Sequence, residues 1–529
     1  MIFQPIQSRY SVNHRFCALI VFFLVPILST TTIAQNTRTP AEKPTTHTDP
    51  SLAQSPTKKA EPVSPEALEK LRLQSVKAYA KGDYEASAQA LRKLIALDSQ
   101  NFVHYYNLAC VRSIQEKPDQ ATELIVQSIE HGFTDVQLLR NDPALANART
   151  TRAFQTLLKN WSKVLDRRIE GDIKRAKQIY LGPYTFTKDP DNRLAYACAY
   201  DATTLTEIRT EVRRVHDWAI DNVFGDVDTD NLVNPDDAWV LIVLPTQKDF
   251  AAWAIATYGA AAHNFNQAIG GHYDNDKKQL VTMDLGSTLR HEYMHVLHWR
   301  DNARHSQQPP IWIQEGLCSL IEDYDFGPDG KLIPIESWRT NQARFLAETG
   351  HLVHLRDLAT MSRKRFLSSR PLAWYAQSRV FFLFLYRQGK LRDWYTHYVE
   401  HYADDPTGIA STQAVFGEDI DTVNKAYADF CRQLPKVPEE VRHGMASLGV
   451  QIDATGTGEG LKINAHVRRD TAGDLKLGDI ITHIDNRPTR DYWELIRVLT
   501  SYEPGQTVSV RYRRGKLHNS TDVLLKAAP

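Results

Sequence analysis

Apolar residues in the N-terminal part of the chain recur at helical spacing in two similar blocks. In the first block, Leu91, Leu94 and Leu97 follow a turn at Gly82. The turn of the second block is centred on Glu116, 34 positions after Gly82. This repeat predicts antiparallel pairs of helices that bury their apolar faces against each other.

The helical pattern extends over residues 66–165, and its last part, 145–165, is predicted to be one helix that closes the array. Residues 178–436 then combine short apolar runs, which predict strands, with longer amphipathic runs, which predict helices. The predicted strands cover 184–186, 194–197, 239–244 and a hairpin (270–274 with 279–283), and the predicted helices cover 205–224, 248–258, 289–300, a stretch from 311, 372–388, 391–402 and 420–434. Because all the predicted strands fall in the first half and the second half is mainly helical, we predict an α+β domain with a sheet-bearing lobe and a helical lobe.

The C-terminal residues, 440–529, are mainly strand-like. The run 506–513 alternates apolar and polar residues after a glycine, and a continuous apolar run lies within 475–485. Between these two runs, Asp491 and Glu494 have the spacing of a helix-capping box, which predicts the start of a helix. This order of elements predicts a small, mainly-β domain with one helix.

The first residues have the pattern of a targeting segment. Basic residues such as Arg9 and Arg15 precede an apolar run that ends before the small residue Ala34. This order predicts a secretory signal peptide over residues 1–34 and export to the periplasm or the exterior, with an uncleaved N-terminal anchor as the alternative. Residues 35–65 are rich in Pro and Thr and poor in large apolar residues, so we predict a disordered linker.

The composition limits the classes of function. The chain has 529 residues, of which 42% are hydrophobic, and 63 basic residues balance 63 acidic ones. This length predicts several domains, and the balanced charge gives no reason to expect nucleic acid or an anionic membrane as a partner. The cysteines outside the signal segment are widely separated and lack zinc-motif spacing, so we assign no disulfide to Cys110, Cys198, Cys318 or Cys431.

The strongest chemical signal is an H-E-x-x-H motif formed by His291, Glu292 and His295. The stretch 289–300 contains neither Gly nor Pro and predicts a helix. Side chains at positions i and i+4 lie on one helical face, about 5–6 Å apart. Both imidazoles can therefore bind one ion, of which Zn²⁺ is the usual one at this motif, and Glu292 is placed to accept a proton from an activated water.

A catalytic zinc needs three protein ligands and one open position. Glu315 stands twenty residues after His295, in a helix that follows two prolines, and is our predicted third ligand. Asp301 is the alternative, six residues after His295. That arrangement needs a Gly at position 298 to turn the chain, whereas His298 continues the helix, so Asp301 is the weaker candidate.

H-E-x-x-H followed by W-x-x-E-G, here Trp312–Gly316, resembles the gluzincin metallopeptidases, in particular their peptidase MA-like branch. The resemblance implies a two-lobed α+β peptidase domain over residues 178–436. It also implies one Zn²⁺ per chain, held by His291, His295 and Glu315, with Glu292 as the general base.

The same resemblance implies two further groups near the zinc. Gluzincins tend to carry a Tyr or His that stabilises the transition state. Tyr375 follows Glu315 at a separation similar to that between the glutamate ligand and this tyrosine in gluzincin aminopeptidases. Several relatives also carry a carboxylate that orients a zinc-bound His. Its usual place holds Ser319 here, which leaves Glu322 and Asp323 as candidates.

Two more resemblances imply binding partners. The period of 34 within 66–165 is similar to tetratricopeptide (TPR) repeats, which hold protein partners or support neighbouring domains. Residues 440–529 resemble a PDZ domain through L-x-x-G-D-x-I at 475–481. In that family, a peptide adds as a strand and its C-terminal carboxylate is held by backbone N–H groups of one loop. The corresponding loop residues are Ser447, Leu448, Gly449 and Val450.

These features together predict an exported zinc metallopeptidase that hydrolyses peptide bonds in proteins or peptides, with PDZ and TPR modules that capture substrates or partners. An endopeptidase is favoured, because no anchor for a free amine precedes the metal helix. The alternative is a non-catalytic adaptor in which the zinc domain is structural or degenerate. Glu292 argues against the adaptor, since a structural zinc site has no use for an adjacent general base.

Overall fold

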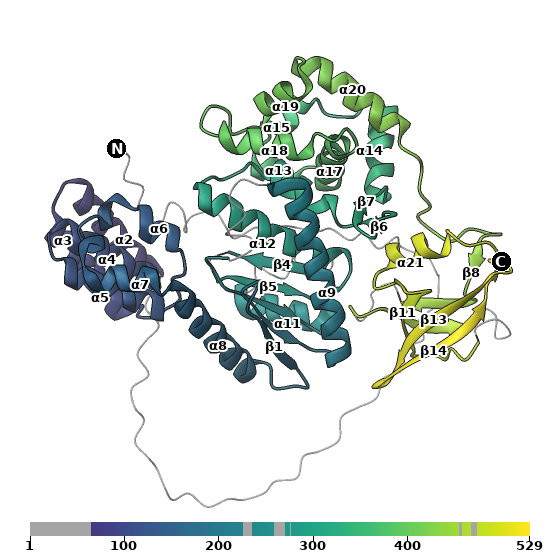
Figure 1. The fold of residues 1–529 in the computed structure, drawn as a ribbon, viewed down its shortest axis with the longest axis horizontal. Coiled ribbons are helices and arrows are strands. Elements are labelled where there is room, and N and C mark those ends of the chain that lie inside the picture. The colour runs from purple at the N-terminus through teal and green to yellow at the C-terminus, as the bar shows by residue number, and fades with distance from the viewer. Residues whose placement is uncertain (1–64, 226–234, 259–269, 276, 454–457, 467–472) are drawn as a thin grey trace, which may run out of the picture. The chain divides into compact units, whose positions relative to one another are not determined.

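The computed structural model describes residues 65–225, 235–258, 270–275, 277–453, 458–466 and 473–529 (Figure 1). The predicted signal peptide and nearly all of the predicted linker lie outside the described residues. Along the described chain, residues 65–133 and 144–148 form one compact unit, and residues 134–143 and 149–529 form a second. None of the described helices is both long and apolar enough to cross a membrane.

The first unit is helical. It contains α2 (Pro65–Ala80), α3 (Tyr84–Leu97), α4 (Phe102–Ile114) and α5 (Pro118–Glu130), and each of these helices contacts the next along the chain. Asp83 and Asn101 cap α3 and α4, because each side chain accepts a hydrogen bond from an amide of the first turn. Ala88, Ala109 and Ala121 are fully buried, which lets the helices approach closely. The helical character of this region is confirmed, and its assignment to the TPR repeats stays a prediction.

The prediction of one helix over 145–165 is wrong. The chain instead forms α6 (Val136–Asn141), two 3₁₀ turns (Pro143–Leu145 and Ala148–Thr150), α7 (Arg152–Lys159) and α8 (Trp161–Ile179). Thr151 caps α7 by accepting a hydrogen bond from Phe154 N at 3.1 Å, and the chain turns at Asn160 before α8. The cap at Thr151 and the turn at Asn160 outweigh the continuous amphipathic period. The last of these helices, α8, packs against the sheet of the second unit.

The second unit contains a five-stranded sheet in the order β1-β2-β3-β5-β4. Its strands are β1 (Thr185–Asp189), β2 (Leu194–Cys198), β3 (Trp239–Val243), β4 (Gly271–Asp274) and β5 (Gln279–Thr282). The strands β2, β3 and β5 are parallel, and β1 and β4 join the edges antiparallel. The predicted hairpin is confirmed as β4 and β5, and β4 is an edge strand. α9 (Ala202–Ala219), a π-helical turn (Ile220–Phe224) and α11 (Gln247–Tyr258) connect the strands.

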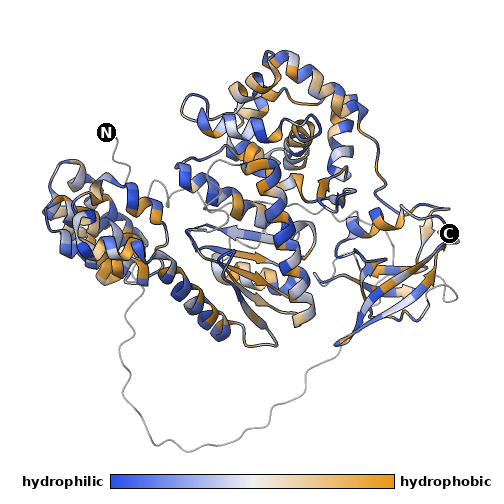
Figure 2. Ribbon diagram, viewed as in Figure 1, coloured by the Kyte–Doolittle hydropathy of each residue, from blue (hydrophilic) through white to orange (hydrophobic). Residues whose placement is uncertain are grey.

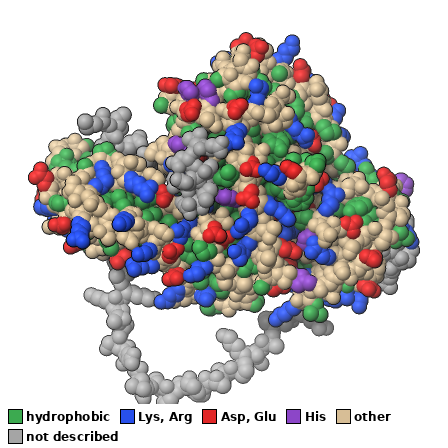
Figure 3. Space-filling view, in the orientation of Figure 1, with side chains coloured by type: hydrophobic (Ala, Val, Ile, Leu, Met, Phe, Trp, Pro, Cys, Tyr) green, Lys and Arg blue, Asp and Glu red, His purple; other side chains and the backbone are tan. Residues whose placement is uncertain are grey.

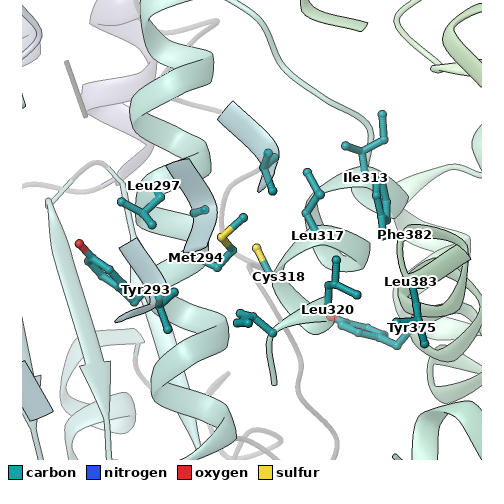
Figure 4. Close-up of a cluster of buried hydrophobic side chains, with 14 of the residues drawn as sticks. Tyr293, Met294, Leu297, Ile313, Leu317, Cys318, Leu320, Tyr375, Phe382 and Leu383 are labelled. Carbon is teal, nitrogen blue, oxygen red and sulfur yellow. The ribbon is translucent and has the colours of Figure 1, made fainter. Parts of the chain in front are cut away.

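The chain after the sheet is mostly helical. It contains α12 (Ser287–His305), α13 (Ile311–Leu320), β6 (Tyr324–Phe326), β7 (Leu332–Pro334), α14 (Trp338–Glu348), α15 (Leu355–Ala359), α16 (Arg363–Ser368), α17 (Pro371–Arg387), α18 (Leu391–Glu400), α19 (Ile409–Phe416) and α20 (Ile420–Gln433). Figure 4 shows how Met294 of α12, Leu317 and Cys318 of α13 and Phe382 of α17 meet in one buried cluster. This apolar contact fixes α12 and α13 against each other, so the α+β architecture of the region is as predicted.

The distribution of hydrophobic and hydrophilic residues agrees with which elements are buried. In Figure 2, α8 is largely hydrophilic, whereas strands of the central sheet carry hydrophobic residues. On the face drawn in Figure 3, acidic and basic side chains are interspersed, in keeping with the balanced charge of the sequence.

Gly316, directly after the predicted ligand Glu315, lets α13 approach α17. A Cβ at position 316 would lie 2.5 Å from the ring of Phe382 and 3.0 Å from the carbonyl oxygen of Ser378. We therefore expect Gly316→Ala to lower the free energy of unfolding by about 1–3 kcal/mol through overpacking. Gly171→Ala in α8 is the matched control. Its added Cβ meets only the end of one Arg side chain at 3.6 Å, so stability should stay level or rise. Urea unfolding of both variants measures the difference, and equal stability would contradict the close approach.

The C-terminal part of the second unit has a mainly-β fold. It contains β8 (Ala446–Ser447), β9 (Val450–Asp453), β10 (Leu461–His466), β11 (Ile480–Ile484), β12 (Arg487–Pro488), α21 (Tyr492–Leu499), β13 (Thr507–Arg514), β14 (Leu517–Leu524) and β15 (Lys526–Ala527). The main sheet runs β14-β13-β11-β10-β9, so β9 is an edge strand. The predicted capping box is half right. Asp491 accepts from Glu494 N at 2.8 Å, but the Glu494 carboxylate accepts from Arg490 N at 2.9 Å.

Candidate metal centre

The H-E-x-x-H residues lie in the first half of α12, where that helix packs against β4 and β5. His291, Glu292 and His295 are buried. The ring of Tyr273, on the edge strand β4, stacks on the His295 imidazole with 4.4 Å between ring centroids. The predicted helix over 289–300 is confirmed, and it places the motif next to the edge strand of the sheet.

Glu315 of α13 meets the two histidines. Its Oε2 atom lies 3.3 Å from His291 Nε2 and 3.5 Å from His295 Nε2, and the two Nε2 atoms are 3.1 Å apart. A tetrahedral zinc with ligand bonds of about 2.0–2.1 Å places its donor atoms about 3.3 Å apart. The three donor atoms therefore have the spacing that one such ion requires, and among the described residues they form a group able to hold a metal ion.

Glu292 has the environment of a reactive carboxylate. It is fully buried, and neither of its carboxylate oxygens has a hydrogen-bond partner among the described residues. Gly271 of β4 packs against its stem, since a Cβ there would lie 2.8 Å from Glu292 Cγ. Burial raises the pKa of Glu292 to about 8. Such a carboxyl can accept and release a proton near neutral pH.

The structure selects Glu322 as the carboxylate that orients a histidine. Its Oε1 atom lies 2.9 Å from His291 Nδ1, and Arg339 donates to both of its oxygens, at 2.6 and 3.0 Å. Although burial would raise the pKa of Glu322, the Arg339 guanidinium outweighs it and lowers the pKa to about 2. Asp323 instead pairs with Arg497 at 3.1 Å, and the buried Ser319 Oγ has no hydrogen-bond partner in the described part of the chain.

Tyr375 lies beside Glu315, one of the three donor side chains. It is buried, and burial together with the neighbouring Glu315 carboxylate raises the pKa of its hydroxyl well above the ordinary value. The phenol therefore stays protonated and can donate a hydrogen bond. The alternative ligand Asp301 lies outside this group, because its carboxylate pairs with Arg304 at 2.7 Å and accepts from Tyr395 Oη at 2.6 Å.

A pocket of about 300 Å³ opens beside His295. Its wall combines aromatic, apolar and cationic side chains, among them Tyr273, Trp299, Ile311, Met361 and Arg363. Concave sites of this size with mostly apolar walls and a few polar groups are typical of ligand-binding sites. The pocket can therefore receive a side chain of a molecule bound at the His-His-Glu group.

Sequence reasoning missed two arginines that support the group, Arg290 and Arg339. Both are buried. Arg290 pairs with Glu211 of α9 at 2.9 Å and donates to the Glu322 carbonyl oxygen, and Arg339 binds the Glu322 carboxylate. Their partners come from elements distant in the sequence, so no local pattern marks them.

The predicted peptide-binding loop lies between β8 and β9. Ser447 Oγ accepts a hydrogen bond from Gly449 N at 3.1 Å, and Gly449 has a φ of +71°, which favours glycine. Leu448 is buried, and Val450 begins the edge strand β9. The chain turns at positions 448 and 449, between β8 and β9.

Comparison with known proteins identifies one domain. Residues 446–525 match the family model described as PDZ domain, so this part of the chain is a PDZ domain, as its sequence predicted. No curated protein matches the chain.

Among solved structures, fifteen chains match. One is an HtrA-type protease (AlgW) with a decapeptide, at 25% identity and a TM-score of 0.15, covering 16% of this chain and 30% of that one. Another is an aminopeptidase N family protein from Idiomarina loihiensis, at 12% identity and a TM-score of 0.25, covering 66% of this chain and 68% of that one. The chain thus spans less than a third of the length of the HtrA-type protease chain. TM-scores this low define neither the fold nor the activity of this chain.

Proposed function

We propose that the protein is an exported zinc-dependent metallopeptidase of gluzincin type that hydrolyses peptide bonds in proteins or peptides. The observation that carries this proposal is Glu292, a fully buried carboxylate without hydrogen-bond partners among the described residues, directly beside three converging donor atoms. A buried ionisable group in such surroundings is costly to the fold and is typical of an acid or base in catalysis.

The roles of the side chains follow from their chemistry. His291, His295 and Glu315 would hold Zn²⁺, which when bound lowers the pKa of a water and polarises a carbonyl group. Glu292 accepts the proton of the attacking water and later donates it to the leaving amine. Tyr375 donates a hydrogen bond to the developing oxyanion. Glu322 holds the His291 ring in the orientation that presents Nε2 to the ion.

The accessory domains would bring substrates or partners to this site. In the PDZ domain, a peptide would add along the edge strand β9, with its C-terminal carboxylate at the loop formed by residues 447–450. The helical pairs of the first unit would bind a protein partner as TPR repeats do. Cleavage within chains is favoured over removal of terminal residues, because the sequence before the metal helix offers no anchor for a free amine.

The test is the zinc content of purified residues 66–529, measured by elemental analysis alongside cleavage of casein and of a peptide library. We expect about one zinc per chain and cleavage, and we expect Glu315→Ala to lose both. Asp301→Asn is the matched control, because it alters the alternative ligand and keeps an acceptor for Tyr395. It should retain zinc and activity. Zinc without cleavage in the unmodified protein would instead favour the adaptor, and absence of zinc would overturn the proposed site.

A further inference from the structure

The helix of the PDZ domain contacts the start of the metal helix within the second unit. Asp491, the residue that caps α21, accepts hydrogen bonds from Ser287 N at 3.3 Å and Ser287 Oγ at 2.9 Å through Oδ2. Its other oxygen, Oδ1, accepts from Glu494 N. One carboxylate therefore caps two helices, α21 with one oxygen and α12 with the other. Gly286 makes this approach feasible, since a Cβ there would lie 2.8 Å from Asp491 Oδ2.

A second carboxylate of α21 reaches one turn further along α12. Glu494 Oε1 lies 2.9 Å from Arg290 Nη1, and the same nitrogen pairs with Glu211 of α9 at 2.9 Å. All three side chains are at most 2% exposed. Arg290 is thus bound from the PDZ domain on one side and from the sheet-bearing region on the other.

Arg290 connects this contact to the predicted ligands. It directly precedes His291, and its Nε and Nη2 atoms donate to the Glu322 carbonyl oxygen at 3.1 and 2.5 Å. The carboxylate of the same Glu322 holds His291 Nδ1. A series of contacts therefore runs from Glu494, through its ion pair with Arg290, to the hydrogen bonds that Arg290 and His291 each make with Glu322.

Further contacts join the PDZ domain to Leu285, just before α12, and to α14. Leu285 N donates to Gly458 O at 3.1 Å, and Arg490 Nη1 donates to Leu285 O at 3.1 Å. Trp493 of α21 stacks on Trp338 of α14 with 5.7 Å between ring centroids. Charged groups are costly to bury, and apolar side chains of similar size would join two surfaces at lower cost. The choice of carboxylates here fits a role in orienting α12, whose N-terminus carries partial positive charge.

We propose that Asp491 and Glu494 of the PDZ domain are positioning residues of the metal centre, which set the position of the first turns of α12 and, through Arg290 and Glu322, the orientation of His291. This proposal rests on the proposed function. Its consequence is that the PDZ domain forms part of the support of the reaction site, in addition to binding a peptide.

The test is Glu494→Gln in the chain 66–529, with Glu503→Gln as the matched control. Glu503 belongs to the same domain but is exposed and lies beyond α21. Removing a residue that directly orients a metal ligand typically lowers metal affinity or activity 10- to 100-fold. Since Glu494 acts on His291 through Arg290 and Glu322, its removal should give the lower end of this range. We expect Glu494→Gln to weaken Co²⁺ and Zn²⁺ binding at least tenfold, to shift the visible bands of the Co²⁺-loaded protein, and to lower kcat on a short peptide about tenfold with KM within twofold. The control should match the unmodified protein.

A second variant keeps every outcome decisive. Asp491→Asn retains a single carbonyl oxygen for the two caps, and should shift the Co²⁺ bands even if Glu494→Gln fails to fold. Unchanged Co²⁺ bands and metal affinity in the folded variants overturn the proposal. If the unmodified protein binds metal but cleaves nothing, the proposed function fails, while the bands and affinities still decide the positioning role. If it binds no metal, both proposals fail.

Discussion

Replacing Glu292 by Gln is expected to lower the rate of peptide-bond cleavage by about 10²–10⁴-fold while leaving about one zinc per chain. Gln has nearly the same shape and fits beside Gly271 as Glu does, but it cannot accept the proton of the attacking water. A general base contributes a factor of this size to catalysis. Since burial already disfavours the charged carboxylate, the neutral side chain should not reduce stability. Cleavage rate, zinc content and unfolding midpoint of the purified variant check the three parts of this prediction.

The control is Glu336→Gln, a similar change at a residue that pairs with Arg387 away from the donor group. It should retain both zinc and full activity. Activity within twofold of the unmodified protein in Glu292→Gln would remove Glu292 from the mechanism. Loss of zinc in this variant would instead assign it to metal binding.

Replacing Arg290 by Met is expected to lower the free energy of unfolding by about 3–5 kcal/mol, the largest effect on stability that we predict. The change leaves the carboxylates of Glu211 and Glu494 buried without their shared cation, and breaking a buried ion pair from one side has this cost. Denaturant unfolding measures the loss.

Arg432→Met is the matched control, because Arg432 and its partner Asp429 are about half exposed. Surface pairs contribute less than about 1 kcal/mol. A second check adds Glu494→Gln to Arg290→Met. Removing one stranded charge should restore part of the lost stability, so the two changes should not be additive. Equal destabilisation by Arg290→Met and Arg432→Met would show that the buried network contributes nothing.

The sequence sufficed wherever the relevant geometry is local. His291 and His295 converge because one helical turn separates them, and the absence of Gly and Pro from 289–300 was enough to predict that helix. The mainly-β character of residues 440–529 was predictable for a similar reason, since the turn and strand signals lie close together, and the PDZ assignment required the resemblance at 475–481. Glu315 required a resemblance, because its distance to the histidines depends on how α13 packs.

Features that depend on packing between distant elements were not predictable. Glu322 could not be chosen over Asp323, since their side chains diverge only through Arg339 and Arg497. The helix expected over 145–165 failed because capping at Thr151 and a turn at Asn160 override the amphipathic period. Arg290 has no local signature, because its partners come from α9 and α21.

The shared cap at Asp491 has a consequence for how such a chain can evolve. A domain that makes no specific contacts with its neighbours can be exchanged by recombination. A PDZ domain from another protein would need, at this place, an acidic residue at its helix cap and a second acidic residue three positions later. A Ser or Thr at the cap position offers a single oxygen and would leave either Ser287 N or Glu494 N without the carboxylate oxygen that Asp491 supplies. We therefore expect the residues at positions 287 and 290 to co-vary with those at 491 and 494 among homologues, because the two pairs form one contact.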